Sequence, residues 1–163
     1  MEIIRLDNIH KTYHRGELAI PDAGDLFNSE HCTVSMNDKH STAKPRIAIV
    51  DDDPGMRRFL ARVLRLTGFS SVSFESGEAF LQEQLREPSV CVLLDLSMAG
   101  ISGFEVKDRL AKSHPNVPVI LITGQTDPAL GVIAQQKGFT ACLAKPLDPP
   151  LLLSAIRQAL GCT

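Results

Sequence analysis

The residues of this chain that could do chemistry are acids, a hydroxyl and a lysine, each placed directly after an apolar run. Asp51, Asp52 and Asp53 follow one run, Asp95 ends a second, and Thr123 and Lys145 follow two more. Carboxylates held close together repel one another unless a cation lies among them, and Mg²⁺ favours carboxylates, a carbonyl and waters as ligands. An ammonium and a hydroxyl supply donors to an anion. Together these groups could accept a phosphoryl group, whose charge must be neutralised.

Each of these residues also has an ordinary structural interpretation. The acids at 51–53 could favour a helix N-terminus, and Asp95 or Thr123 could cap a turn or helix. Lys145 could be a solvated surface residue. Ligands of open α/β sheets bind beside the carboxyl ends of the strands, however, and all four positions follow separate strand-like runs. That shared placement favours a functional site.

The strand that ends at Asp95 is the centre of the predicted sheet. Residues 90–94 are consecutive apolar residues, which is typical of a strand buried on both faces of a parallel sheet. Residues 117–122 have the same continuous character, so this strand is also expected to be central. We expect the remaining strands at 46–50, 70–74 and 140–144.

Helical segments with start and stop signals separate these strands. Pro54 and Ser76 mark helix starts, and Gly68 and Gly138 mark helix ends. Further helices are expected from about 103, from 127 to 136 and from 148. The alternation of five strands with five helices predicts an α/β fold, a (βα)5 doubly wound parallel sheet covered on both faces. The helical residues expected to face the core are Met56, Phe59, Leu60, Val63, Leu64, Phe80, Leu81, Leu85, Phe104, Val106, Leu110, Ala111, Leu152, Ile156, Ala159 and Leu160.

Composition narrows the function classes further. The chain has 163 residues, 44% of them hydrophobic and 22% charged, which fits one globular domain. A net charge of -2 gives no basic excess for nucleic acid. No run of 18 apolar residues and no signal-peptide order is found, so we expect a cytoplasmic protein without membrane contact. The widely spaced cysteines favour reduced thiols.

Residues 1–44 differ from the rest and are predicted to be a largely flexible N-terminal extension to a domain at 45–163. This part holds four of the 5 histidines and is polar beyond residue 22. Residues 1–20 weakly resemble the start of an ATP-binding-cassette ATPase, in which the aromatic matching Tyr13 stacks on adenine. No GxxxxGK[ST] phosphate loop follows, so ATP binding is not expected. His10 and His14 could share a metal, although exposed histidines are the plainer interpretation.

From about Pro45 to Leu160 the chain closely resembles the receiver domain of bacterial two-component response regulators. The motifs that carry the resemblance are Val-Asp-Asp-Asp-Pro, Leu-Leu-Asp-Leu-Ser-Met with Gly103 downstream, Ile-Thr-Gly and Ala-Lys-Pro. Around Thr123 and Gly124 it is most similar to receivers of the nitrogen-fixation regulator type. The resemblance implies a flavodoxin-like sheet of strand order 2-1-3-4-5.

The resemblance also implies roles for individual residues. Asp95 matches the phosphoacceptor, Thr123 the switch hydroxyl, and Lys145 the lysine that bonds the phosphoryl oxygens. Magnesium is implied as the cofactor, and the matching ligands are Asp51, Asp52, Asp95 and the backbone carbonyl of Ser97. Asp53 is expected to be a helix cap.

Two positions depart from the family pattern. Ala99 stands where the family usually has Pro, so the loop after Asp95 is expected to be less rigid. Cys142 stands where an aromatic switch residue is usual. Phosphorylation is unaffected by these departures, but the route from phosphate to output is altered.

The predicted function is therefore that of a signalling switch rather than an enzyme. A sensor histidine kinase or a histidine phosphotransfer protein donates the phosphoryl group. Because few residues follow the last helix, output is expected through contact with a downstream protein. The alternative is a haloacid-dehalogenase-like phosphohydrolase using Asp51 and Asp53, although Gly55 departs from its motif. A pseudo-receiver that only binds partners is disfavoured by the complete acidic set.

Overall fold

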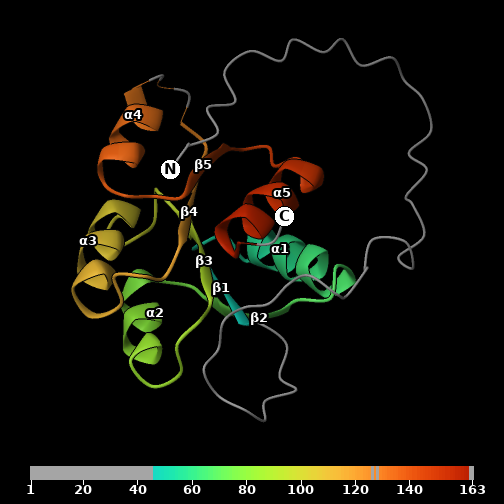
Figure 1. The fold of residues 1–163 in the computed structure, drawn as a ribbon, viewed down its shortest axis with the longest axis horizontal. Coiled ribbons are helices and arrows are strands. Elements are labelled where there is room, and N and C mark those ends of the chain that lie inside the picture. Colours follow the sequence, from blue (N-terminus) through green and yellow to red (C-terminus); the bar gives the residue numbers. More distant parts are fainter. Residues whose placement is uncertain (1–45, 126, 128, 162–163) are drawn as a thin grey trace.

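The structure is a computed structural model that describes residues 46–125, 127 and 129–161. The predicted extension at 1–44, with Tyr13, His10 and His14, lies outside the described residues. Within the described ranges, five strands alternate with five helices (Figure 1). Their bounds are β1 (Arg46–Val50), α1 (Pro54–Leu66), β2 (Ser70–Phe74), α2 (Gly77–Gln84), β3 (Cys91–Asp95), α3 (Gly103–Ser113), β4 (Val119–Thr123), α4 (Ala129–Gln136), β5 (Ala141–Ala144) and α5 (Pro149–Ala159).

The strands form one parallel sheet in the order β2-β1-β3-β4-β5. Both the (βα)5 architecture and the predicted strand order are confirmed. Strands β3 and β4 are fully buried, as their unbroken apolar sequences predict. Because every strand runs the same way, all five carboxyl ends lie along one edge of the sheet.

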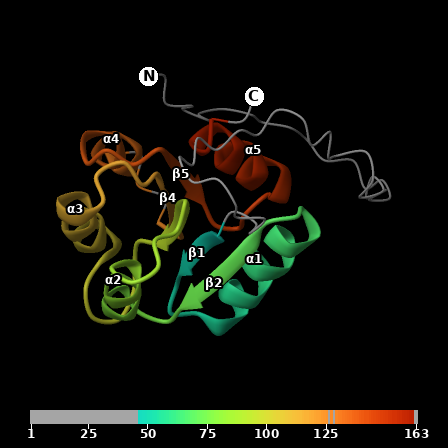
Figure 2. The ribbon, with the colours of Figure 1, turned by 60° about the horizontal axis from the view of Figure 1, so that its bottom comes forward.

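The helices divide between the two faces of the sheet, with α1 and α5 on one face and α2, α3 and α4 on the other (Figure 2). Side chains alternate along each strand, so one set from β1 and β3, which includes Ile49 and Leu93, packs with Leu60 of α1 and Ile156 of α5. The other set, which includes Leu94, packs against α2, α3 and α4. The sheet therefore has an apolar core on each face, and this packing holds its carboxyl edge in place.

Capping residues set the helix bounds where the sequence places them. Ser76 accepts a hydrogen bond from the Ala79 amide at 3.2 Å and begins α2. Gly68 and Gly138 follow α1 and α4 with φ of 85° and 73°, a left-handed conformation that favours glycine. These predicted boundaries are confirmed.

Three residues predicted to face the core do not. Phe59 is 38% exposed, Leu85 is 68% exposed, and Ala111 is exposed. On α3 the inward place is taken by Lys107, which is buried, and burial lowers the pKa of its ammonium despite the opposing charge of Asp108. A long aliphatic stem can lie along apolar surface, and hydropathy patterns rate such a residue as polar throughout.

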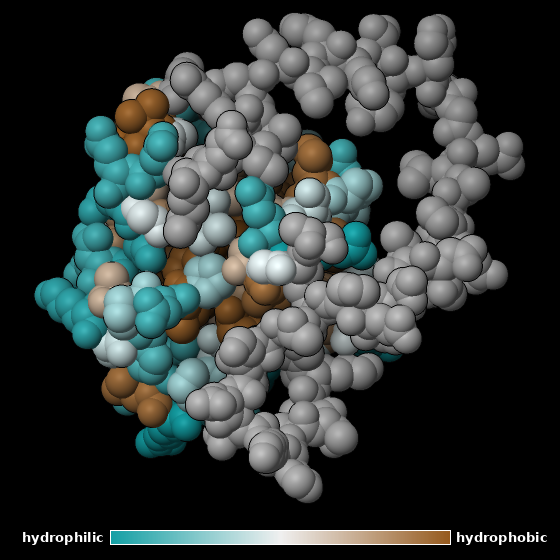
Figure 3. Space-filling view, in the orientation of Figure 1, coloured by the Kyte–Doolittle hydropathy of each residue, from teal (hydrophilic) through white to brown (hydrophobic). Residues whose placement is uncertain are grey.

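The surface agrees with this layering. In Figure 3 hydrophilic side chains cover the outer side of α3, and hydrophobic atoms show both between the elements and in smaller areas on the outside. Leu85, Val132 and Ile133 are among the exposed large hydrophobic residues. None of the helices in the described part of the chain is long and apolar enough to cross a bilayer.

Candidate functional site

The carboxyl edge of the sheet brings four predicted site residues together. Asp51 directly follows β1, Asp95 ends β3, Thr123 ends β4 and Lys145 directly follows β5. The Lys145 amide donates to the Thr123 carbonyl at 2.7 Å, which holds these two residues side by side. Asp51, Asp95 and Thr123 are buried, with at most 3% of each residue exposed. Buried polar groups need partners, and each of these three has one.

Three carboxylates converge at this edge. Asp51, Asp52 and Asp95 each offer an oxygen atom, and the three atoms lie within 4.8 Å of one another. Asp52 is exposed while the other two are buried, so the group opens to solvent on one side. An all-oxygen donor set of this charge fits a hard divalent cation such as Mg²⁺, which retains waters on its open side.

Lys145 supplies the opposing charge. Its Nζ lies 3.0 Å from Asp51 Oδ2 and 2.7 Å from Asp95 Oδ1. Burial disfavours the ammonium, but the hydrogen bonds and charges of Asp95 and Asp51 outweigh it and raise the pKa of Lys145. Lys145 is therefore a permanent cation at neutral pH.

The electrostatics of Asp95 are a balance of opposing effects. Burial raises the pKa of its carboxyl group, the Lys145 hydrogen bond and charge lower it, and the negative charge of Asp51 raises it again. The net pKa is above the ordinary value. A carboxylate less well solvated than usual is a better nucleophile once a cation offsets its neighbours.

Loop hydrogen bonds orient the acids. The Ser97 amide donates to Asp95 Oδ2 at 2.9 Å, and the Asp53 amide donates to Asp51 Oδ1 at 2.8 Å. The Ala99 amide donates to Asp52 Oδ2 at 3.2 Å. A proline at position 99 would have no such donor, so the departure from the family pattern adds a contact to the exposed acid.

Two further residues belong to the site and were missed from the sequence. Arg57 Nη1 donates to the carbonyls of Asp51 at 2.6 Å and Asp52 at 3.0 Å, which fixes the loop after β1. In the sequence, the one indication of this role is that Arg57 follows the acidic residues 51–53 within the first turns of the expected helix. The side-chain Nε2 of Gln125 donates to Ser97 Oγ at 3.1 Å, and its backbone amide donates to Thr123 Oγ1 at 3.0 Å. Gln125 therefore joins the loop after β4 to the loop after β3.

Asp53 takes no part in the acidic group. It is exposed, and its Oδ1 accepts from the Gly55 amide at 2.7 Å as the N-cap of α1. The predicted cap is confirmed. A phosphohydrolase that uses Asp51 and Asp53 together would need the second carboxylate free to move a proton, and here it is held by the helix terminus.

A model of the response regulator receiver domain matches residues 47–157. The chain belongs to this family. Nodulation protein W of Bradyrhizobium diazoefficiens is 33% identical over 119 residues, which cover 73% of this chain and 52% of that protein. The transcriptional regulatory protein FixJ of Azorhizobium caulinodans is 33% identical over 115 residues, covering 71% and 54% respectively. Similarity to receivers of the nitrogen-fixation type is thereby confirmed.

Solved receiver structures share the fold. A CheY-like receiver domain protein from Methanospirillum hungatei JF-1 superposes with a TM-score of 0.69 at 25% identity, covering 73% of this chain and 95% of that one. The chain spans about half the length of the curated relatives it matches. As a receiver, it is a two-component phosphoacceptor domain with an acidic pocket, rather than a classical enzyme.

Proposed function

We propose that Asp95 is the phosphoacceptor of this receiver. The observation that carries the proposal is the double contact of Lys145, whose ammonium joins the buried carboxylates of Asp95 and Asp51 at the carboxyl edge of the sheet. Asp95 ends the central, fully buried strand and faces the other acids. A carboxylate oxygen forms the new bond to phosphorus, and the bond from phosphorus to the donor breaks in the same transfer.

Lys145 and Thr123 are proposed to serve the transferred group. An ammonium 2.7 Å from the accepting carboxylate is positioned to bond a phosphoryl oxygen once Asp95 carries one. The buried Thr123 hydroxyl can donate to another, since its oxygen acts as the acceptor in its hydrogen bond with the Gln125 backbone amide. Both are strong donors toward developing negative charge.

Magnesium is the proposed cofactor, held by Asp51, Asp52, Asp95 and the carbonyl of Ser97. When bound, Mg²⁺ supplies positive charge that offsets the phosphoryl oxygens. The protein side of this arrangement consists of acids already oriented by backbone amides, so little reorganisation is needed for ligation.

Receiver domains act with histidine kinases, and we propose specific classes of partner for this one. A sensor histidine kinase or a histidine phosphotransfer protein is the donor, a downstream protein is the target, and the cytoplasm is the compartment. The whole chain, with a net charge of -2, has no basic excess, which argues for protein targets over direct binding of nucleic acid.

Incubation with acetyl phosphate and Mg²⁺ tests the function. Intact mass spectrometry should show the addition of one phosphoryl group, and EDTA should prevent it. Steady turnover of para-nitrophenyl phosphate without a stable adduct would instead support the phosphohydrolase alternative and contradict the proposal.

A further inference from the structure

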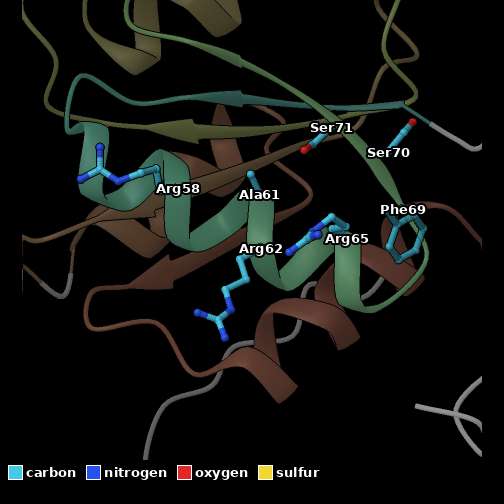
Figure 4. A pocket seen from close by; sticks show the side chains of 7 residues that line it. All are labelled: Arg58, Ala61, Arg62, Arg65, Phe69, Ser70 and Ser71. Carbon is cyan, nitrogen blue, oxygen red and sulfur yellow. The ribbon is translucent and has the colours of Figure 1, made fainter.

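An arginine-lined surface cavity lies away from the phosphoryl site, between α1 and the start of β2. Arg58, Arg62 and Arg65 line it from one side of α1, and the cavity has a volume of about 530 Å³ (Figure 4). Their spacing of four and three residues places them on one face of the helix. Phe69 and Ser71 complete the wall from the β2 side. We refer to these three arginines as the arginine face.

The arginine face has no acidic counterpart in the described part of the chain. All three side chains are exposed, and no ion pair within residues 46–125, 127 and 129–161 includes them. Some other cations there are paired, as Arg109 is with Glu105 and Lys137 is with Asp108. Three like charges within about 10 Å along a helix are unfavourable, and they form a strong site for carboxylate or phosphate groups.

The topology puts the start of β1, where residues 1–45 join the domain, close to this face. Ser70 and Ser71, which line the cavity, are the register partners of Arg46 and Ile47 in β1. Neighbouring strands lie about 4.8 Å apart, so residues 1–45 join the domain within about one strand spacing of the cavity wall.

The sequence of that part has the complementary charge. Between residues 17 and 38 there is no lysine or arginine, and the acids are Glu17, Asp22, Asp25, Glu30 and Asp38. The connecting residues 39–45 can span up to about 25 Å when extended. A tether of this length gives an effective concentration in the millimolar range, so weak individual pairs suffice for occupancy.

We propose that the acidic segment at residues 17–38 binds the arginine face of α1 within the same chain. Guanidinium groups on the helix pair with carboxylates of the segment, and the contact is electrostatic and sensitive to salt. The assignment explains why a helix of this domain carries three unpaired arginines next to the point where a long acidic segment enters. It uses no residue of the phosphoryl site.

Cys32 lies in the acidic segment and allows a direct test with a spin label on the full chain. Cys142 and Cys162 are replaced by alanine, whereas Cys91 can remain because burial raises the pKa of its thiol to about 12 and prevents labelling at neutral pH. Amide signals of residues 58–71 should lose intensity about twofold or more in about 0.02 M salt and recover in about 0.5 M salt, where charges are screened.

Two sets of variants identify the contact. Arg58→Glu, Arg62→Glu and Arg65→Glu combined should abolish the loss of intensity. Arg86→Glu, in the turn after α2, and Lys112→Glu, on α3, change exposed cations elsewhere and should leave it unchanged. Because three changes on α1 could disturb folding, the second set replaces the five acids of the segment by Asn or Gln and leaves the domain intact. This set should restore the signals equally.

Three results would overturn the proposal. One is full intensity at residues 58–71 in low salt, which would leave the arginine face to an external anion or an acidic partner. Another is a loss that neither set of variants changes. The third is a loss that appears when spin-labelled chains without ¹⁵N are mixed with unlabelled ¹⁵N chains, since that contact would join two copies.

Discussion

At the scale of single residues, the site depends on how charge is balanced at the sheet edge. Asp51 and Asp95 are buried and share one ammonium, that of Lys145, while Asp52 is exposed and bonded only by the Ala99 amide among the described residues. The buried pair is thus neutralised partly without metal, and the exposed acid provides the remaining metal ligand. This division predicts different consequences for removing an acid and removing the lysine.

We expect Asp52→Asn to lose most Mg²⁺ affinity, about tenfold or more, with little change in stability because the side chain is exposed. Lys145→Ala should bind Mg²⁺ at least as tightly, since a competing cation is gone, but it should be phosphorylated about 10²-fold more slowly. The chain has no tryptophan, so isothermal titration calorimetry is the suitable measurement for the metal. Equal loss of Mg²⁺ binding in both variants would contradict the assigned roles.

Gly103 is a second residue on which the site depends. A Cβ there would lie 2.4 Å from the Asp95 carbonyl oxygen and 3.0 Å from Leu96 Cα, so α3 can approach the end of β3 only with glycine. Gly103→Ala should lower the free energy of unfolding by about 1–3 kcal/mol in urea titration. Gly131→Ala is the matched control: it lies in α4 with nothing within 4 Å of the added Cβ and should be stabilising by about 0.5–1 kcal/mol. If both substitutions changed the free energy of unfolding in the same direction, the argument that only glycine fits between α3 and β3 at position 103 would be wrong.

At the scale of elements, the sequence predicts what depends on local pattern. The continuous apolar residues of β3 and β4 and the caps at Asp53 and Ser76 are one-dimensional signals, and the structure agrees with them. Parallel strands then require Asp95 and Lys145 to share an edge. The fold and the main acidic site follow from these signals together with the family motifs.

What the sequence could not predict depends on helix rotation and on loop geometry. Phe59 and Ala111 lie at the margins of their apolar faces, where a small rotation exposes them, and Lys107 is buried although its polarity predicts the reverse. The contacts of Arg57 and Gln125 join loops whose paths have no periodic pattern. Contacts of this kind can be found only once the three-dimensional path of the loops is known.

The elements that respond to phosphorylation are predicted to be the loop after β4 and α4, rather than β5. Cys142 is only partly buried beside the core and fills little volume, so its alternative rotamers differ little in packing energy. α4 exposes most of its residues and contains Gly131, so it opens at low cost. Amide exchange with and without beryllofluoride should change between residues 124 and 137 and change little at 140–144.

A large change centred on residues 140–144 would show that Cys142 acts as a full switch residue. Cys142→Tyr provides the comparison, because a ring at this position fills the space that the thiol does not. In that variant the change on adding beryllofluoride should extend into β5.

At the scale of the whole molecule, the described domain has its own core on both faces of the sheet. Removal of residues 1–44 should therefore leave the fold and phosphorylation nearly unchanged, because that segment has little periodic apolar sequence. Loss of an exposed electrostatic contact costs at most about 1 kcal/mol. A melting temperature lowered by more than about 8 °C in calorimetry would show instead that the segment is structural.

The central claim is that Asp95 carries the phosphoryl group, and reductive trapping tests it most directly. After reaction with acetyl phosphate and Mg²⁺, borohydride converts an aspartyl phosphate to homoserine, which peptide mass spectrometry locates in the sequence. We expect homoserine at position 95 alone and none in Asp95→Asn, which keeps the shape of the side chain but removes the nucleophilic carboxylate. Homoserine at Asp51 or Asp52 in the unmodified sequence, or an undiminished phosphoryl adduct in Asp95→Asn, would contradict the account.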